Sequence, residues 1–327
     1  MAKNSEFDKI PARNNILKNP LSADFCYNLD RLQIQKTKVR TMKFGSVEAG
    51  GTKFVVAIGN EDFKILETEQ FPTTTPAETI AKTIDYFTAH PVDALGIGSF
   101  GPIDINPDSL TYGYITTTPK PGWENTDLLG EIQTALQIPV AFTTDVNSSA
   151  YGEAMVTGED SLVYFTIGTG IGGGALQHGQ FVGGVSHAEM GHQLVKRHPD
   201  DLDFAGVCPF HGDCLEGVAS GPSLEVRTGI RGEDLPLNHE LWDIQAYYIA
   251  QAAVNTTLTL RPGKIIFGGG VMAQTHMMAR VREQFASLLN GYVQLPCPLE
   301  DYLLTPSVLN NGSATIGNFA LAAQKLL

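Results

Sequence analysis

The sequence has no apolar run approaching the length of a transmembrane helix, and it does not open with the apolar core of a signal peptide. These absences predict a cytoplasmic protein with no membrane partner. Basic residues are also scarce, because 22 lysines and arginines stand against 35 acidic residues, for a formal net charge of -13. A nucleic-acid-binding protein would be expected to show a basic face. The charge therefore argues against nucleic acid as a partner.

Cysteine is rare too, with four residues in a chain of 327, and two of the four lie in a cluster typical of metal ligands. A disulfide scaffold is therefore not expected, and a reducing cytoplasm fits the cysteine usage. What the chain does have is 43% hydrophobic residues and enough length for two domains with a sizeable core.

The most informative feature is a strand–glycine–strand unit at residues 44–59. A β-rich run enters Glu48-Ala-Gly-Gly-Thr52, and a second β-rich run follows directly at residues 53–58. A dinucleotide-binding fold would place a helix after its glycines, whereas these residues favour a strand. Backbone N–H groups of a glycine hairpin can approach an anion because no Cβ intervenes. The adjoining carboxylate of Glu48 and hydroxyl of Thr52 suit a metal-bound phosphate.

A second unit of the same kind spans residues 162–179, where a β-rich run enters Gly168-Thr-Gly-Ile-Gly-Gly-Gly174. One glycine hairpin alone is weak evidence for a site, because such hairpins are ordinary turns. Two matched units at the start of two halves are much harder to dismiss. Together they predict a duplicated architecture with phosphate held between the halves.

The rest of the chain alternates strands and helices. Thr75, Pro76 and Glu78 have the order of an N-cap, a first-turn proline and a capping-box acid for a helix to about residue 89. Further strands are expected at 94–99, 139–143 and 264–267, and further helices at 148–155, after 243, after 270 and at 313–326. This alternation in two related halves indicates two α/β domains.

We expect the first domain to comprise residues 42–157 plus 310–327, and the second to comprise residues 158–309 with an irregular, metal-binding insert. Residues 1–41 differ from both, being polar, locally rich in lysine and arginine, and without sustained periodicity. We interpret them as an N-terminal extension that is disordered or not native. The alternative is a small DNA-binding or partner-docking arm. It is disfavoured because the segment is short for a winged helix and has no helix-turn-helix pattern.

Asp145 follows a β-rich run directly and precedes a predicted helix. In open α/β sheets, ligands bind at that edge. Phosphoryl transfer needs positioning, charge neutralisation and a carboxylate to accept the proton of the attacking hydroxyl. Asp145 is our candidate for this base. A plain N-terminal helix cap is an equally good interpretation from position alone.

A second cluster contains Glu189-Met-Gly-His192, followed by Cys208, His211 and Cys214. Two histidines and two cysteines form a ligand set that tetrahedral zinc uses, and it leaves no coordination position open. We therefore predict a structural zinc site that stabilises the insert. The alternative is two buried thiols beside unrelated surface histidines. The histidines at 178, 187 and 198 lack cysteine partners at ligand spacing, so we expect them to be hydrogen-bonded or exposed.

Gly268, Gly269 and Gly270 end a predicted strand and are expected to open a helix. Such a turn lets an adenine or a ribose lie against the backbone without side-chain interference. A simple strand-to-helix turn explains the three glycines equally well.

Taken together, these motifs resemble the ROK family of sugar kinases, over Met42 to the C-terminus and in the same order. The similarity is greatest to the bacterial fructokinase branch, which shares the run Tyr114-Ile-Thr-Thr-Thr-Pro-Lys-Pro121 and the stretch Arg197-His-Pro-Asp-Asp201. The resemblance implies the actin-like ATPase fold, an α/β fold of two ribonuclease-H-like domains with an interdomain cleft. It also implies an ATP-dependent fructokinase that forms D-fructose 6-phosphate, with ATP, Mg²⁺ and structural Zn²⁺ as cofactors and a homodimeric assembly.

The resemblance also assigns site residues, with Asp145 as the base that accepts the sugar hydroxyl proton. The sugar-binding candidates are Asn147, Glu189, His192, Gly101 and Thr118. The ATP-binding candidates are Gly50, Gly51, Thr52, Lys53, Thr169, Gly170, Pro222, Gly268, Gly269 and Gly270. The zinc ligands are His192, Cys208, His211 and Cys214.

Three other functions stay open from the sequence. The nearest is a kinase for glucose, mannose or N-acetylmannosamine on the same scaffold, since a few hydroxyl contacts decide sugar identity. A sugar-sensing repressor would need a DNA-binding module, and nothing in the chain resembles one. A filament-forming, actin-like structural protein is a remote third.

Overall fold

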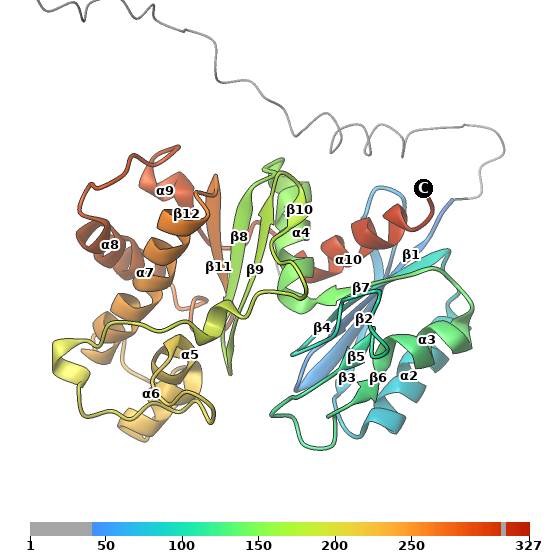
Figure 1. The fold of residues 1–327 in the computed structure, drawn as a ribbon, viewed down its shortest axis with the longest axis horizontal. Coiled ribbons are helices and arrows are strands. Elements are labelled where there is room, and N and C mark those ends of the chain that lie inside the picture. Colours follow the sequence, from blue (N-terminus) through green and yellow to red (C-terminus); the bar gives the residue numbers. More distant parts are fainter. Residues whose placement is uncertain (1–40, 309–311) are drawn as a thin grey trace, which may run out of the picture.

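The computed structural model describes residues 41–308 and 312–327, which form two five-stranded sheets side by side (Figure 1). The interpretation of residues 1–41 as an extension falls, up to residue 40, outside the described residues. Within the described ranges, no helix combines the length and apolar character needed to cross a bilayer.

The first sheet has the strand order β3-β2-β1-β4-β7. Its members are β1 (Phe44–Ala49), β2 (Lys53–Gly59), β3 (Ile65–Pro72), β4 (Ala94–Ser99) and β7 (Val140–Thr144). The hairpin strands β1, β2 and β3 are antiparallel, whereas β4 is parallel to both β1 and β7. The alternation of Phe, Val and Ile in these strands builds one continuous core beneath this sheet.

The second sheet repeats this plan with the order β10-β9-β8-β11-β12. Its members are β8 (Leu162–Ile167), β9 (Ile171–Gln177), β10 (Gln180–Phe181), β11 (Lys264–Gly268) and β12 (Leu303–Leu304). The antiparallel hairpin β8–β9 again precedes a parallel neighbour, β11. Two sheets with the same order and the same strand directions confirm the duplicated architecture that the two glycine units predicted.

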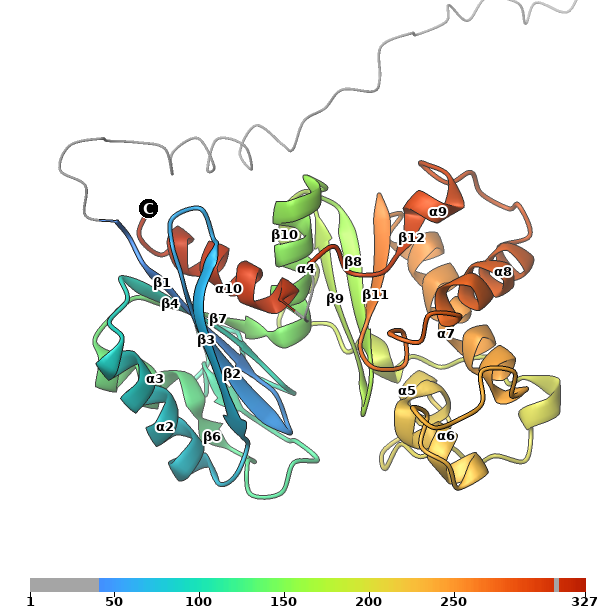
Figure 2. The ribbon, with the colours of Figure 1, turned by 180° about the vertical axis from the view of Figure 1, so that it is seen from behind.

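Seven of the described helices form three groups around these sheets (Figures 1 and 2). α2 (Pro76–Ala89) and α3 (Leu128–Leu136) pack together beside the first sheet. α4 (Asp145–Thr157) packs on β8 and β9, α10 (Ser313–Gln324) packs on β1 and β4, and the two helices pack on each other. The second sheet carries α7 (Leu241–Thr259), α8 (Met277–Leu289) and α9 (Leu299–Tyr302).

The close crossing of α4 and α10 joins the two halves. A Cβ on Gly317 would lie 1.8 Å from the carbonyl oxygen of Ser148, and one on Gly152 would lie 1.9 Å from that of Ser313. Only glycine permits this approach. Buried Asn318 adds a polar link, because its side chain accepts from Ser148 and donates to Ser46. The domain boundaries given above stay a prediction.

Several segments differ from the sequence-based expectation. The helix expected from Ser148 begins at Asp145, because the Thr144 side chain accepts from the N–H of Asn147 and caps it. The glycines at 268–270 do not open a helix, since a turn follows them and α8 begins only at Met277. The loop from residue 114 contains a small sheet of β5 (Tyr114–Ile115) and β6 (Thr126–Asp127).

The predicted insert over residues 189–214 is irregular, as expected. It contains two short 3-10 helices, η1 (Met190–His192) and η2 (Pro199–Asp201). Two helices that the sequence did not suggest follow it, α5 (Leu215–Ala219) and α6 (Gly221–Thr228). The predicted cap at Thr75 is confirmed, because its side chain accepts from the N–H of Glu78 at the start of α2.

Candidate active site

Asp145 lies at the carboxyl end of β7, in the first turn of α4, and is half-buried. Thr144 supplies the helix cap, so the interpretation of Asp145 as a plain cap is wrong. One oxygen of the Asp145 carboxylate accepts from the N–H of Val146 at 2.9 Å. Burial raises the pKa of Asp145 to about 6, this hydrogen bond opposes the shift, and the Glu189 carboxylate adds to it. A carboxylate with such a pKa is ionised at neutral pH yet basic enough to accept a proton.

Glu189 comes from the other half of the chain, at the start of η1, and lies near Asp145. Its Oε1 is 3.4 Å from Nδ1 of His187, and a Cβ built on Gly101 would lie 3.6 Å from the same oxygen. Gly101 follows β4 of the first sheet. The structure thus brings Gly101, Asp145 and Glu189 close together, and their binding of a sugar stays a prediction. His187 was expected to be hydrogen-bonded or exposed, and it is hydrogen-bonded, to the backbone of Ile103.

The two other predicted sugar-binding residues have different surroundings. Asn147 is buried two residues beyond Asp145, and its amide donates to the Thr143 hydroxyl at 3.1 Å. Thr118 is buried in the loop after β5, where its hydroxyl accepts from the N–H of Lys120 at 3.3 Å. Among the contacts recorded for the described residues, none joins Thr118 to Asp145 or Glu189.

The first glycine hairpin joins β1 to β2 through Gly50, Gly51 and Thr52. The N–H of Gly50 donates to the carbonyl of Lys53 at 3.1 Å, and a Cβ on Gly50 would collide with that oxygen at 2.7 Å. A Cβ on Gly51 would meet nothing within 4 Å, so its backbone is open to a ligand. The Lys53 side chain instead donates to Gln70 on β3, at 2.9 Å.

A cation that the sequence reasoning missed lies beside this hairpin. Thr73 donates to the carbonyls of Thr52 and Gly50, at 2.9 and 2.7 Å, and its own carbonyl accepts from Nζ of Lys120 at 3.3 Å. Within the described ranges, Nζ of Lys120 has no other hydrogen-bond partner, so two of its three donors can face a ligand. The sequence feature that could have pointed to Lys120 is its position in the Pro-Lys-Pro run that resembles fructokinases.

The second hairpin collects most of the predicted ATP-binding residues. The N–H of Gly221, which precedes Pro222 in α6, donates to the carbonyl of Gly168 at 2.7 Å. A Cβ on Gly168 would lie 3.9 Å from the nitrogen of Gly270. Gly269 has φ +88°, and a Cβ there would collide with the carbonyl of Ile167. Thr169, Gly170, Pro222 and residues 268–270 therefore meet at the carboxyl end of β8, whereas the first hairpin lies on the other sheet.

Glu216 of α5 was not anticipated. Its Oε2 accepts from the N–H of Ile171 at 2.9 Å and lies 2.8 Å from the position of a Cβ on Gly170. Because Glu216 follows Cys214 closely in the chain, the cysteine cluster and the second hairpin are structurally linked. The only feature of the sequence that could have pointed to Glu216 is its position two residues after Cys214, a predicted zinc ligand.

The predicted ligand set His192, Cys208, His211 and Cys214 is brought together, with all four ligand atoms within 4.8 Å of one another. Nδ1 of His192 lies 3.7 Å from Sγ of Cys208 and 3.6 Å from Sγ of Cys214. Sulfur and nitrogen ligands of one tetrahedral zinc ion lie roughly 3.5 Å apart, so the donor set and its spacing fit zinc. This grouping favours a zinc site over the alternative of buried thiols and surface histidines, and zinc binding itself stays a prediction.

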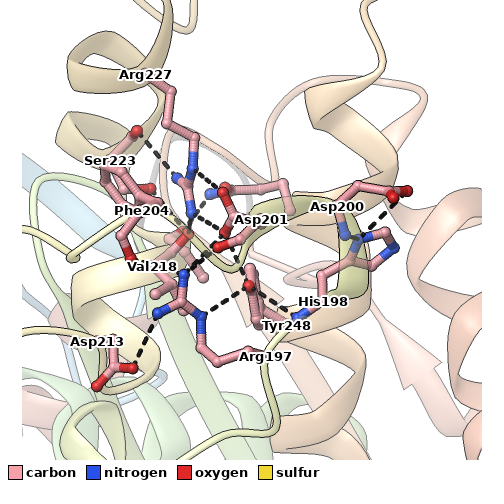
Figure 3. Close-up of polar contacts among 12 residues, drawn as sticks. Arg197, His198, Asp200, Asp201, Phe204, Asp213, Val218, Ser223, Arg227 and Tyr248 are labelled. Carbon is pink, nitrogen blue, oxygen red and sulfur yellow. Dashed lines mark hydrogen bonds and ion pairs between the residues drawn. The ribbon is translucent and has the colours of Figure 1, made fainter.

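The stretch that resembles fructokinases, residues 197–201, forms a buried ion-pair network (Figure 3). The Asp201 carboxylate accepts from Arg227 of α6 at 2.7 and 2.9 Å and from the Tyr248 hydroxyl of α7 at 2.8 Å. Burial acts to raise the pKa of Asp201, but these hydrogen bonds outweigh it and the pKa is lowered. Arg197 also pairs with Asp213, which lies in the sequence between the predicted zinc ligands His211 and Cys214. The network therefore attaches the insert to α6 and α7.

The sequence of this chain is similar to those of known sugar kinases. Residues 44–325 match the ROK family. The chain is 61% identical over 279 residues to a fructokinase of Lactococcus lactis subsp. cremoris, covering 85% of this chain and 96% of that protein.

Solved structures share the fold at lower identity. A ROK hexokinase from Thermus thermophilus superposes with a TM-score of 0.70 at 23% identity, over 87% of this chain and 99% of that one. A ROK family glucokinase from Streptomyces griseus, in complex with glucose and AMPPNP, gives a TM-score of 0.68 at 23% identity, over 87% and 99%. The fold is thus the two-domain, actin-like ATPase fold of these kinases. The chain belongs to the ROK family.

Proposed function

We propose that this sugar kinase is an ATP-dependent fructokinase that transfers the γ-phosphoryl group of ATP to the 6-hydroxyl of D-fructose. The fructokinase relative at 61% identity supports the sugar, and the AMPPNP-bound glucokinase supports the nucleotide. The observation that carries the proposal is the half-buried carboxylate of Asp145, which lies at a sheet edge beside Glu189 and has a raised pKa.

In this proposal Asp145 accepts the proton of the sugar hydroxyl as its oxygen bonds to the γ-phosphorus and the bond to ADP breaks. With a pKa near 6, Asp145 is ionised at neutral pH and can take that proton. Glu189 accepts from another sugar hydroxyl, and Gly101 leaves room for the sugar ring. Asn147, His192 and Thr118 complete the proposed sugar site.

The two glycine hairpins hold the triphosphate through backbone N–H groups of Gly51, Thr169 and Gly170, with Gly50, Thr52 and Lys53 beside them. Lys120 adds a positive charge next to the first hairpin. The nucleoside lies along residues 268–270 and Pro222. Mg²⁺ would be held with the phosphates near Glu48 and Thr52, where it would supply positive charge to neutralise the charge that develops during transfer.

The Cys/His cluster binds a structural zinc ion in this proposal. His192 ends η1, and Glu189 precedes the same short helix, so a metal bound to His192 would fix the backbone position of Glu189. The metal thereby supports the sugar site without touching the reacting atoms.

We also propose a cytoplasmic homodimer that binds only these small molecules; the family resemblance and the composition support it. Sedimentation of the purified protein measures the assembly. A gel shift at physiological salt measures any binding to DNA, which the repressor alternative requires.

The experiment that tests the activity is a coupled ADP-release assay with fructose, glucose, mannose and N-acetylmannosamine at equal concentrations. We expect the highest kcat/KM with fructose. A higher value with any other sugar would assign the enzyme to that sugar instead. No ADP release with any of them would refute a kinase role.

A further inference from the structure

His187 connects the two halves of the molecule at the assigned sugar site. It lies in the loop after β10, and its imidazole reaches the loop after β4 in the first half. The N–H of Ile103 donates to Nε2 of His187 at 3.1 Å, and the carbonyl of Ile103 is at the same distance. The His187 side chain is only 4% exposed, so these contacts are shielded from water.

The other ring nitrogen faces the carboxylate of Glu189. With Nε2 accepting from Ile103, the ring proton is on Nδ1, which lies 3.4 Å from Oε1 of Glu189. Oε1 of Glu189 thus faces Nδ1 of His187, and Oε2 stays available to a ligand. The Glu189 side chain, at 46% exposed, would otherwise be free to rotate.

We propose that His187 is a positioning residue for sugar binding, which fixes the Glu189 carboxylate and fastens it to the Gly101–Ile103 loop. The proposal rests on the proposed function, because it takes Glu189 as a sugar ligand. His187 touches no reacting atom. Because it orders the Glu189 side chain before the sugar binds, sugar binding loses less conformational entropy. Its loss should therefore weaken sugar binding without weakening ATP binding.

Two conservative variants separate the two contacts of the ring. The amide nitrogen of asparagine takes the place of Nδ1, so H187N keeps a donor for Glu189 and loses the link to Ile103. The amide of glutamine reaches the place of Nε2, so H187Q keeps the link and loses the donor. H178N is the matched control, because His178 is an exposed histidine at φ +51° in a turn, where asparagine is well tolerated.

The sugar panel is measured first with the wild-type protein, so failure of the proposed function appears there. KM values for the best sugar and for ATP, sugar Kd by calorimetry, and thermal unfolding are then compared across variants. We expect H187A and H187Q to raise the sugar KM and Kd by about tenfold or more, with the ATP KM unchanged. H187N, which keeps the donor but loses the link, should recover part of this affinity, and H178N should match the wild type.

An unchanged sugar KM in H187A would overturn the inference. So would equal rises in both KM values together with a lower Tm, because this pattern indicates general loss of structure. Recovery by H187Q but not by H187N would assign the effect to the Ile103 link and remove the role of Glu189.

Discussion

Replacing Asp145 by asparagine tests the catalytic assignment with little change in shape. In the wild-type protein the N–H of Val146 donates to Oδ1 of Asp145 at 2.9 Å. Asparagine retains an oxygen that can accept this hydrogen bond, and Thr144 still caps α4. It cannot take up a proton from a sugar hydroxyl. The variant should therefore fold, bind both substrates and fail in the chemical step.

The expected loss follows from the role of a general base, which contributes about 10²- to 10⁴-fold to a rate. We expect kcat to fall by that factor at neutral pH. Because the pKa of Asp145 is raised to about 6, wild-type kcat/KM should fall about tenfold per pH unit below that value. A protonated carboxyl group cannot accept the sugar proton. This acidic limb should be absent from the residual activity of Asp145→Asn.

The same substitution should stabilise the fold. The pKa of Asp145 rises from its ordinary 3.8 to about 6, so the folded state disfavours the ionised carboxylate. Below pH 3.8 the group is protonated in both states and costs nothing. The cost grows as pH rises to 6 and is complete above it, at up to about 3 kcal/mol. Asparagine carries no charge and avoids this cost. At pH 7.5 the free energy of unfolding of the Asp145→Asn protein should therefore exceed that of the wild type.

The assay is the coupled ADP measurement across the acidic and neutral range, with thermal unfolding of each protein at pH 7.5. Asp127→Asn is the control, since Asp127 caps α3 through the N–H of Gly130 and asparagine caps equally well. It should leave kcat and Tm unchanged. Near-wild-type kcat in Asp145→Asn, or an acidic limb that persists in it, would refute the assignment.

Three further predictions concern the surroundings of the site. Cys214→Ser should lower bound zinc, measured by elemental analysis, and Tm together; full zinc content would contradict the metal assignment. Asp201→Asn should destabilise the fold by about 3–5 kcal/mol in denaturant unfolding, because Arg227 is left buried without its counter-charge; an unchanged midpoint would disprove this. Gly101→Ala should preserve Tm yet raise the sugar KM, since its methyl would lie beside Glu189; an unchanged KM would place the sugar elsewhere.

The local elements of this protein could be read from its sequence because their causes are local. Strands at 94–99 and 162–167 have the predicted bounds, since buried runs between turn residues favour strands. Thr75 and Pro76 define a helix start through contacts within one turn. Cys208, His211 and Cys214 were found by their spacing, which limits how far apart their side chains can lie.

The sequence alone could not give contacts between segments that are distant along the chain. His187 meets Ile103, Lys120 meets Thr73, and Asp201 meets Tyr248 only because two sheets, their loops and the insert pack in one particular way. No periodicity or spacing encodes such pairs. The expectation that the helix begins directly after Gly270 was wrong for a similar reason. A turn held by the N–H of Val271 on the carbonyl of Ile167 comes first, and that bond exists only once β8 and β11 are paired.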